Sequence, residues 1–521
     1  MLTGRIPFDR YPGLSPLFLD FLRGLPEFYP DAPSLEAAAA RGRQMLGRPA
    51  RIPAEAFRAR LPEARGMAED LAAGRAVAVL AGHQIGLFTG PLFTITKAFD
   101  AIRVARELRE RGVPAVPVFW ALTDDHDLDE IARTARPDKE EVQILVLEGA
   151  DRANRKPVGG LPLPEKTRDI LEAFRGDARG PEGEEVLEAF ARRYSPGTSY
   201  GEAFIETLFD LVGGEPLLVL DPASEALRRQ AAEFFLSAAR SRDAVLGAWR
   251  AVAERLERAG KPVPVPFREG VFPFFTVEKG ERHRVASAEA AAESVSRGTA
   301  WISTDVLTRP VFKSHLLPVA ASVLGAAEIA YHAHSLALFP EFHLAPPVLL
   351  PRSHLLLLGP SERRIAEALV IAPENLLQPL PPAAPPAIPE LDLLAGVASG
   401  AETSLSSLEP RLRELDATLS GALETARRKI AYQFDQLGER IRKAVERKDE
   451  TATKRRRRLQ TMLLPNGTPA ERLYPPLVPL LAYGREALAA IREGATGSTS
   501  GAEIVNMGAD RPAETERVHA G

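Results

Sequence analysis

The chain of 521 residues contains no cysteine. This absence excludes disulfide bonds, catalytic thiolates, and zinc or iron–sulfur sites held by cysteine ligands. It also agrees with a reducing compartment. No apolar run reaches the roughly 18 residues that a membrane-spanning helix needs, and residues 1–18 lack the pattern of a signal peptide. The sequence therefore predicts a soluble cytoplasmic protein.

The chain also lacks an excess of charge of either sign. Its 66 basic and 70 acidic residues leave a net charge of −4 at pH 7. Without a basic excess, we expect neither nucleic acid nor an anionic membrane as a partner. Hydrophobic residues make up 45% and charged residues 26%, as in globular proteins. The length predicts two to four domains.

Residues 76–122 have the pattern of a β-α-β unit. The apolar run AVAVLA at 76–81 is typical of a buried parallel strand. Helical periodicity follows over 92–110 and ends before Gly112, and AVPVFWAL at 115–122 is a second apolar strand. We therefore predict an α/β fold with a parallel sheet. Further strands are predicted at 142–147, 217–220 and 346–350, a hairpin at 271–280, and helices at 166–193 and 286–297.

The C-terminal third has a different organisation. Prolines crowd residues 373–389 and predict an extended linker. Apolar residues then recur at spacings of three and four from Leu412 to Ala444, a stripe typical of a coiled coil or of a two-helix hairpin packed on its own core. Residues 477–492 form a second helical stretch that can fold back on the first. The predicted limits are a core at 1–375, a linker at 376–395, a coiled coil at 396–493 and a disordered tail at 494–521.

The segment GHQIGLFTGP at 82–91 follows the first strand and opens the helix. Free backbone N–H groups and the positive helix end favour an anion at such a turn, and glycines permit a close approach. The spacing is neither GxGxxG nor a Walker loop, and a tight turn with an exposed histidine is the structural alternative. The predicted phosphate- or carboxylate-binding residues here are Gly82, His83, Gln84, Gly86, Thr89 and Gly90.

Acidic residues surround a histidine directly after the second strand, in the segment Asp124–Asp127. This is the carboxyl end of a parallel strand, where ligands bind in open α/β sheets. Carboxylates beside a histidine suit general acid–base catalysis or a divalent metal, whereas an N-cap cluster is the structural alternative. We predict catalytic roles for Asp125, His126 and Asp127, and binding roles for Asp124 and for Trp120 on the strand.

A third group of polar residues lies between residues 303 and 352. Arginines in it can clamp a carboxylate or a phosphate in bidentate fashion. His332 and His334 stand two residues apart in a predicted helix and so do not face one another; no metal site is expected from them. The predicted binding residues of this group are Ser303, Arg309, Glu328, Tyr331 and Arg352.

With these residues assembled, the chain resembles the bacillithiol biosynthesis cysteine-adding enzymes, a family of cysteine ligases. The matching pieces include GHQIGLFTGPLFTITKA, PVFWALTDDHDLDE, STDVLTRP, VLGAAEIAYHAH, PPVLLPRS and LLPNGTPAER, in family order. The resemblance implies a Rossmann-like, nucleotidyltransferase-type core with inserted helical pieces. It also implies a C-terminal coiled coil that pairs two subunits as a homodimer. The implied reaction joins cysteine to the amine of glucosaminyl-malate.

Two positions depart from the family pattern. His83 stands where a glutamine is usual, and Asp124 where a glutamate is usual. The first change makes the turn similar to the His-containing phosphate-binding motif of nucleotidylyltransferases. Both changes leave open the alternative that the chain is a ligase for a different low-molecular-weight thiol.

The leading hypothesis is a ligase that activates a carboxylate, commonly at the expense of ATP, without a metal. Its Asp125, His126 and Asp127 would position and deprotonate the attacking amine. His83 is also predicted to be catalytic, within the turn that cradles a phosphate or carboxylate. Arg309 and Arg352 would clamp the malyl carboxylates. The alternatives are a metal-dependent hydrolase centred on Asp124–Asp127, and a coiled-coil assembly protein.

Overall fold

The computed structural model describes residues 2–148, 155–380, 388–416 and 419–508. The chain divides into two compact units. Residues 1–138, 142–378 and 462–521 make up the first, here called the core unit. Residues 139–141 and 379–461 make up the second, the helical unit. Among the described residues, no helix combines the length and the apolar character needed to cross a membrane.

A five-stranded parallel sheet lies at the centre of the core unit, in the order β11-β10-β2-β3-β6. Its strands are β2 (Val77–Gln84), β3 (Ala115–Leu122), β6 (Leu218–Leu220), β10 (Val319–Leu324) and β11 (Val348–Pro351). Helix α4 (Phe93–Glu110) joins β2 to β3. The predicted β-α-β unit and parallel sheet are therefore confirmed, and the strands predicted near 217–220 and 346–350 belong to this sheet.

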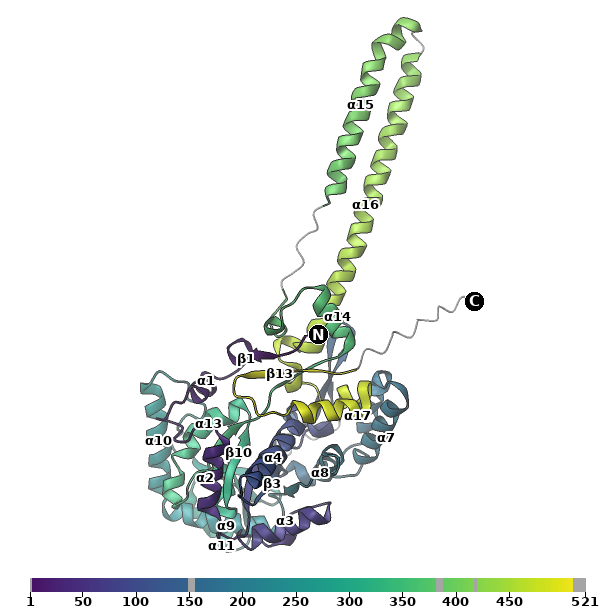
Figure 1. The fold of residues 1–521 in the computed structure, drawn as a ribbon. Coiled ribbons are helices and arrows are strands. Elements are labelled where there is room, and N and C mark those ends of the chain that lie inside the picture. Colours follow the sequence, from purple (N-terminus) through teal and green to yellow (C-terminus); the bar gives the residue numbers. More distant parts are fainter. Residues whose placement is uncertain (1, 149–154, 381–387, 417–418, 509–521) are drawn as a thin grey trace. The chain divides into compact units, whose positions relative to one another are not determined.

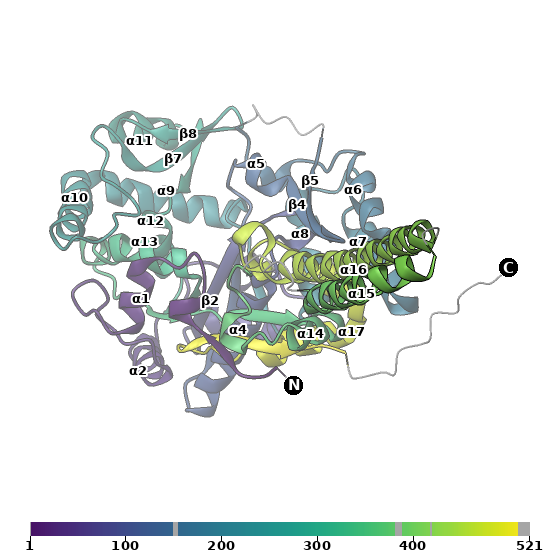
Figure 2. The same cartoon turned by 90° about the horizontal axis from the view of Figure 1, so that it is seen from above.

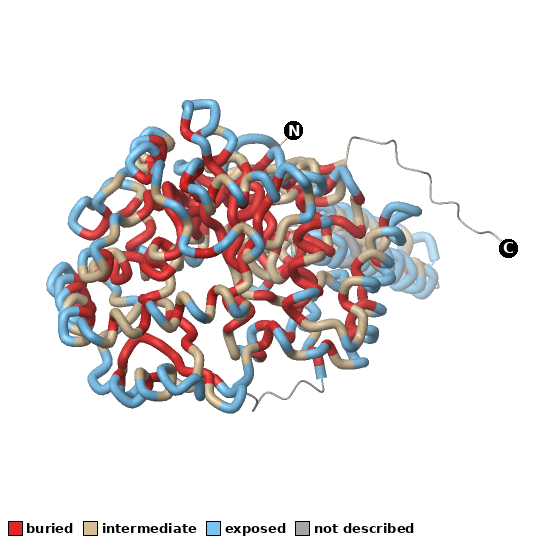
Figure 3. The backbone as a smooth tube through the Cα atoms, turned by 90° about the horizontal axis from the view of Figure 1, so that it is seen from below, coloured by how far each residue is buried: buried red, intermediate tan, exposed pale blue. Residues whose placement is uncertain are grey.

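Both faces of this sheet are buried. Val77 and Val79 of β2 join one hydrophobic cluster, whereas Ala78 and Leu80 join the other, on the opposite face. Successive side chains of a strand point to opposite faces, so a strand covered on both sides must be apolar throughout. Figure 3 shows the resulting concentration of buried backbone in the middle of the core unit.

The direction in which strands are added reverses next to β2. The chain runs from β2 outward through β3 to β6, and then returns to place β10 on the other side of β2. Helix α13 (Ala326–Leu336) follows β10. In open α/β sheets, ligands bind outside the carboxyl ends of the strands at such a reversal. The topology thus points to the ends of β2, β3 and β10.

A second sheet and its helices lie to one side of α4, and the helices α6 to α8 lie to the other (Figure 2). The sheet has the order β8-β7-β9 and confirms the predicted hairpin. Its strands are β7 (Phe272–Glu278), β8 (Glu281–Val285) and β9 (Ala300–Thr304). The neighbouring helices are α9 (Glu225–Arg240), α10 (Arg242–Arg258), α11 (Ala288–Ser296) and α12 (Thr308–Leu316).

The helical region predicted at 166–193 is divided in two by a turn at Arg175–Asp177. The elements on this side are α5 (Leu128–Ile131), β4 (Arg133–Asp138), β5 (Glu141–Val146), α6 (Thr167–Phe174), α7 (Gly180–Arg193) and α8 (Tyr200–Leu211). The strand predicted at 142–147 is β5, which pairs with β4 outside the central sheet. The remaining helices of the core unit are α1 (Pro16–Leu22), α2 (Leu35–Met45), α3 (Pro62–Ala72), α14 (Pro360–Ala368) and α17 (Leu477–Gly494).

The tail predicted to be disordered from residue 494 contains a strand. β13 (Gly501–Asn506) lies between β1 (Arg5–Pro7) and β12 (Leu355–Leu358), with both of which it pairs. The tail was predicted to be disordered because it is rich in small and polar residues. A strand can nevertheless form there, because β13 makes backbone hydrogen bonds with a neighbouring strand on each side. The prediction was wrong for 501–506; residues 509–521 lie outside the described part of the chain.

Most of the helical unit is formed by α15 (Pro389–Leu415) and by α16 (Leu419–Leu463) up to residue 461, which lie side by side in Figure 1. Arg427 of α16 donates to Ser406 of α15 at 2.9 Å, and Gly438 faces Leu394. Contacts that run in opposite directions along the two helices define an antiparallel hairpin.

The partner of the long helix was therefore predicted wrongly. Helix α17 packs in the core unit instead, where the Arg179 amide donates to the Leu481 carbonyl at 2.8 Å. The error arose because α15 begins at Pro389, inside the segment predicted as a linker up to residue 395. A proline is tolerated in the first turn of a helix, where its missing N–H has no intrahelical acceptor.

Candidate functional site

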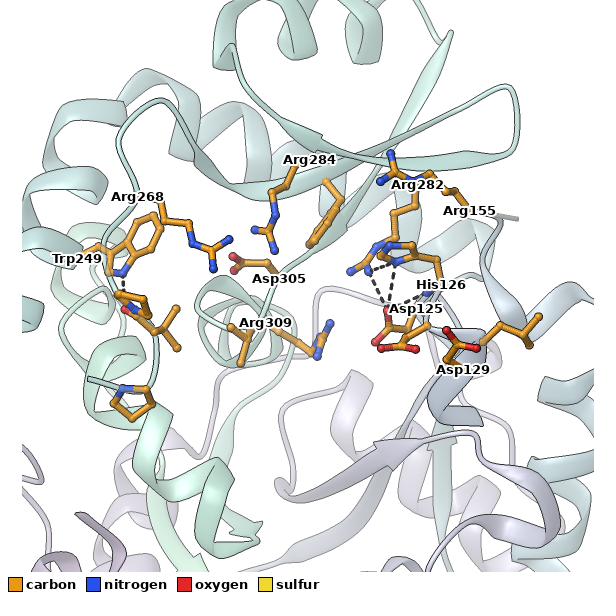
Figure 4. A pocket seen from close by; sticks show the side chains of 17 residues that line it. Asp125, His126, Asp129, Arg155, Trp249, Arg268, Arg282, Arg284, Asp305 and Arg309 are labelled. Carbon is orange, nitrogen blue, oxygen red and sulfur yellow. Dashed lines mark hydrogen bonds and ion pairs between the residues drawn. The ribbon is translucent and has the colours of Figure 1, made fainter. Parts of the chain in front are cut away.

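A pocket of about 710 Å³ opens where the segment after β3 meets the β7–β8–β9 sheet and α12 (Figure 4). At one end lie Asp125, His126 and Asp129, and at the other lie Trp249 and Arg268. Of the residues that the structure describes, five arginines and four aspartates line it. The size is that of small-molecule sites, and so many arginines favour an anionic ligand.

Arg282 of β8 organises the acidic end of the pocket. Its side chain is only 3% exposed, and its guanidinium lies 3.7 Å from the centre of the Phe275 ring. It donates to Asp125 Oδ1 at 2.9 Å through Nη1 and to Ser303 Oγ at 3.1 Å through Nε. A buried guanidinium needs such partners because an unpaired charge is costly away from water.

The same guanidinium determines which nitrogen of His126 can carry a proton. Arg282 Nη1 lies 2.9 Å from His126 Nδ1. A guanidinium only donates hydrogen bonds, so Nδ1 must accept and a neutral imidazole carries its proton on Nε2. His126 therefore offers an N–H donor to a ligand. This differs from the predicted role as the base that deprotonates an amine.

Asp125 is held as a carboxylate. Burial alone would raise its pKa, but the charges of Arg282 and Arg309 outweigh burial and keep the pKa below its usual range. The His126 backbone amide also donates to Asp125 Oδ1 at 2.8 Å. The Gln84 amide also donates to Asp125 Oδ2 at 3.2 Å. Gln84, at the end of β2, is thus brought next to the acidic segment after β3, because these two parallel strands are neighbours in the sheet.

The other two aspartates of the motif make their hydrogen bonds with other residues, although Asp127 also lines the pocket. Asp124 is buried, and its Oδ2 accepts a hydrogen bond of 2.6 Å from Ser303. Ser303 in turn accepts from Arg282, so Asp124 is connected to Arg282 through Ser303. Asp127 caps α5 by accepting from the Glu130 amide at 3.1 Å. For Asp127 the structural alternative, an N-cap, describes the contact. Nowhere in the described residues do three His, Asp or Glu side chains group as metal ligands.

Asp305 lies in the middle of the pocket, between Arg268, Arg284 and Arg309 (Figure 4). Its Oδ1 accepts from the amides of Leu307 and Thr308 at 2.9 and 3.1 Å at the start of α12. Burial raises the pKa of Asp305, and those amides and the charge of Arg309 offset the rise only in part. A carboxylate with a raised pKa accepts a proton more readily than an ordinary one.

A second polar cluster lies at the reversal point of the sheet. Lys97 of α4 donates to the Gly82 carbonyl at 3.0 Å and forms an ion pair of 2.5 Å with Glu328. Glu328 also accepts from the Gly325 amide and so caps α13. Burial would raise the pKa of Glu328, but Lys97 outweighs it and lowers the pKa to about 2. The predicted binding residue Glu328 is thus committed to Lys97.

His83 borders this cluster, with its ring centre 4.8 Å from that of Phe93. Burial lowers its pKa to about 3, and the nearby positive charge of Lys97 acts in the same direction. His83 is therefore neutral at neutral pH and supplies no positive charge to a phosphate. Tyr331, also predicted here, is half-buried on α13, and its ring stacks on His332 at 5.2 Å.

The predicted anion cradle of the glycine-rich turn is filled by the protein itself. Residues Gly82 to Gln84 belong to β2, and a Cβ at Gly82 would lie 2.7 Å from the Trp120 carbonyl oxygen. The Thr89 amide donates to Tyr194 Oη at 2.8 Å, and Thr89 is fully buried. Gly86 and Gly90 pack against each other, since a Cβ at Gly86 would lie 3.0 Å from Gly90 Cα. These glycines serve close packing.

Two further predicted binding residues are part of the interior. Trp120 is fully buried and packs edge-on against Phe312. Arg352 is 3% exposed and forms a bidentate ion pair with Glu471, with distances of 3.0 and 2.8 Å. Its guanidinium is thereby committed, so the predicted clamp of Arg309 and Arg352 is not assembled. Arg309 does line the pocket.

Several site residues carried no signal in the sequence. Arg282 and Arg284 belong to β8, directly after the hairpin predicted at 271–280. The sequence around these two arginines matched no functional motif. Lys97 and Glu471 lie within the segments GHQIGLFTGPLFTITKA and LLPNGTPAER, which a resemblance can mark as important without showing their contacts. Ion pairs between residues more than 100 positions apart leave no local periodicity to detect.

Comparison with known families covers most of the chain. Residues 25–353 match the family described as "Bacillithiol biosynthesis BshC, N-terminal Rossmann-like domain". Residues 391–506 match "Bacillithiol biosynthesis BshC, C-terminal coiled-coil domain". The predicted Rossmann-like core and helical C-terminal part are confirmed by these matches and by the sheet topology.

Individual relatives agree with these matches. A protein of Solibacter usitatus named "Putative cysteine ligase BshC" is 28% identical over 452 residues, which cover 82% of this chain and 83% of the relative. One of Symbiobacterium thermophilum with the same name is 29% identical, covering 78% of this chain and 80% of the relative. One of Halalkalibacterium halodurans is 33% identical over 54% of this chain and 56% of the relative.

Proposed function

The chain belongs to the bacillithiol biosynthesis BshC family, and we propose that it is a cysteine ligase that joins cysteine to the amine of glucosaminyl-malate. The observation that carries the proposal is the pocket, where His126 and Asp305 share one space with several arginines. A ligase of this kind must bind carboxylates, take a proton from an amine and stabilise negative charge on a carbonyl oxygen.

The reaction needs an activated carboxylate, and we assign this step to ATP. ATP would convert the cysteine carboxylate into an acyl group that carries a phosphate-containing leaving group. The acceptor nitrogen then attacks the carbonyl carbon, the C–N bond forms, the leaving group departs with the electron pair of the C–O bond, and the nitrogen loses one proton. Arg268 and Arg284, both exposed to the pocket, match the phosphates in charge.

The proposal gives each pocket residue a role that its contacts permit. Asp305 accepts the amine proton, because its pKa is raised and its Oδ2 makes no hydrogen bond to a described residue. His126 donates its Nε2–H to the carbonyl oxygen as negative charge develops there. Arg282 holds His126 in this tautomer, and Arg309 takes a malyl carboxylate.

The test supplies the purified full chain with cysteine, glucosaminyl-malate and ATP, and follows bacillithiol by mass spectrometry. We expect product with the wild type, and turnover about 100- to 10,000-fold lower for Asp305→Asn, the usual range for loss of a general base. The matched control is Glu293→Gln, an exposed glutamate of α11 outside the pocket, which should behave as the wild type.

The outcomes separate the parts of the proposal. A folded wild type that forms no bacillithiol refutes the substrate assignment, and other amine acceptors then become the candidates. Product formed equally well by Asp305→Asn removes Asp305 from the reaction. Product formed without ATP removes ATP as the activating agent.

We also propose that the helical unit pairs two chains. Large apolar side chains are exposed on it: Leu393 is 71% exposed, Val397 61% and Tyr432 58%. Apolar surface on an elongated hairpin is typical of a coiled-coil contact with another helix pair. The cytoplasmic location expected from the sequence stays a prediction.

Light scattering of the full chain tests the pairing. The wild type should have twice the mass of one chain, and Leu393→Glu combined with Val397→Glu should shift the mass toward that of one chain. Ser399→Glu combined with Thr403→Glu is the matched control, since it adds the same two charges at the same spacing to the same helix without removing large apolar side chains. A wild type with the mass of a single chain contradicts the proposal.

A further inference from the structure

Two cations stand one turn apart on α12 without a carboxylate partner. Arg309 and Lys313 are both half-buried, and among the described residues neither forms an ion pair within 4.0 Å. Arg309 donates only to the Thr304 carbonyl at 3.2 Å, and its Nε is buried without an acceptor. Residues four apart on a helix lie on the same face, so the two side chains leave α12 on the same side.

Three cations of this region that are almost fully buried are paired. Lys97 has Glu328, Arg282 has Asp125 and Arg352 has Glu471. Burying a cation without a partner costs free energy. Two such cations on one helix face therefore indicate that a bound anion neutralises them. The Trp120 ring, whose centre lies 5.2 Å from Lys313 Nζ, provides a flat base beneath the ammonium.

From these contacts we infer that Arg309 and Lys313 together form a carboxylate-binding site for the dicarboxylate end of the acceptor. The identification of that end as the malyl group rests on the proposed function. Lys313 takes the place that Arg352 was predicted to hold. Arg309 borders the pocket, so the bound carboxylates lie next to the space in which His126 and Asp305 act.

The surroundings of Lys313 give this site a measurable property. Burial lowers the pKa of Lys313 to about 7, and the positive charge of Arg309 on the same helix adds to the effect. Glu328 from α13, Lys97 from α4 and Asp124 from the end of β3 are the other charges that act on it. A carboxylate bound beside Lys313 favours the charged form, so binding draws a proton from solution.

The experiment measures proton uptake on binding. The full chain is titrated with L-malate at pH 8 by calorimetry, in two buffers of different ionisation enthalpy. At pH 8 an amine with a pKa of about 7 is about nine-tenths neutral. We expect an uptake approaching 0.9 proton, roughly that neutral fraction, for each malate bound.

Variants distinguish a binding role from a structural one. Lys313→Met should bind malate about 10- to 100-fold more weakly, the range for loss of a charged hydrogen bond, and without proton uptake. Lys313→Arg should bind without proton uptake, because a guanidinium is already charged. Lys166→Met, at an exposed lysine of the α6 start, is the matched control and should leave both quantities unchanged.

Several results would overturn the inference. Malate binding without proton uptake in the wild type, or uptake that persists in Lys313→Met, shows that Lys313 does not face the ligand. Pyrophosphate or cysteine binding with Lys313-dependent uptake, in place of malate, shows that the site takes another anion. The absence of bacillithiol formation, with Lys313-dependent malate binding intact, refutes the proposed reaction and leaves this site standing.

Discussion

Replacing Glu471 by glutamine should destabilise the core unit strongly, although the volume of the side chain stays almost unchanged. Glu471 is 1% exposed and accepts hydrogen bonds from two segments of the chain, at Tyr11 and at residues 352–355. Arg352 donates at 3.0 and 2.8 Å, Tyr11 at 2.5 Å, His354 at 3.0 Å and the Leu355 amide at 2.8 Å. The variant leaves the Arg352 guanidinium buried without a counter-charge, which costs about 3–5 kcal/mol.

Denaturant unfolding followed by tryptophan fluorescence measures this loss. The three tryptophans, at positions 120, 249 and 301, all lie in the core unit, so their signal reports on that unit. Glu293→Gln, which disturbs only an exposed ion pair with Arg297, is the control and should change the free energy of unfolding by less than about 1 kcal/mol.

The pH dependence of the same measurement has a defined sign. Burial would raise the pKa of Glu471, but Arg352 and His354 outweigh it and hold the pKa well below the ordinary 4.5. A carboxyl group with a depressed pKa stabilises the fold above its unfolded value and loses that contribution as the pH falls. The difference between wild type and Glu471→Gln should therefore be full at pH 7 and shrink below about pH 4.5. A loss under about 1 kcal/mol at pH 7 would refute this account of the ion pair.

Three further predictions follow from single contacts. If His126 acts through Nε2–H, His126→Gln, whose amide can donate from a similar place, should retain more turnover than His126→Ala; equal loss in both contradicts this. Gly82→Ala should cost roughly 1–3 kcal/mol of unfolding free energy because its Cβ meets Trp120, whereas Gly66→Ala on an exposed helix face should stabilise by up to about 1 kcal/mol. Burial lowers the pKa of His334 to about 4 from 6.5, so the fold loses stability as the pH falls between these values. His334→Leu should gain about 2 kcal/mol over wild type on going from pH 8 to pH 5 in the same unfolding assay, and an equal difference at both pH values would sink this reading.

The sequence by itself determined the elements whose evidence is local. The apolar runs at 76–81 and 115–122 predicted strands, and the structure extends the first by only three residues, to Gln84. A strand covered on both faces must be apolar at every position, so it appears in the sequence as a continuous apolar run. The acidic segment after β3 was likewise found because strand ends and their neighbours are adjacent in the chain.

The tertiary structure alone decided what these residues contact. Arg282 lies 157 positions from Asp125, yet it orients both Asp125 and His126. Arg352 looked like a free clamp until the fold placed Glu471, 119 positions away, against it. Which charges are paired and which stay available depends on where distant segments meet, and no local periodicity encodes that. For this reason the acidic segment that borders the candidate site could be identified from the sequence, whereas the contacts of its residues required the fold.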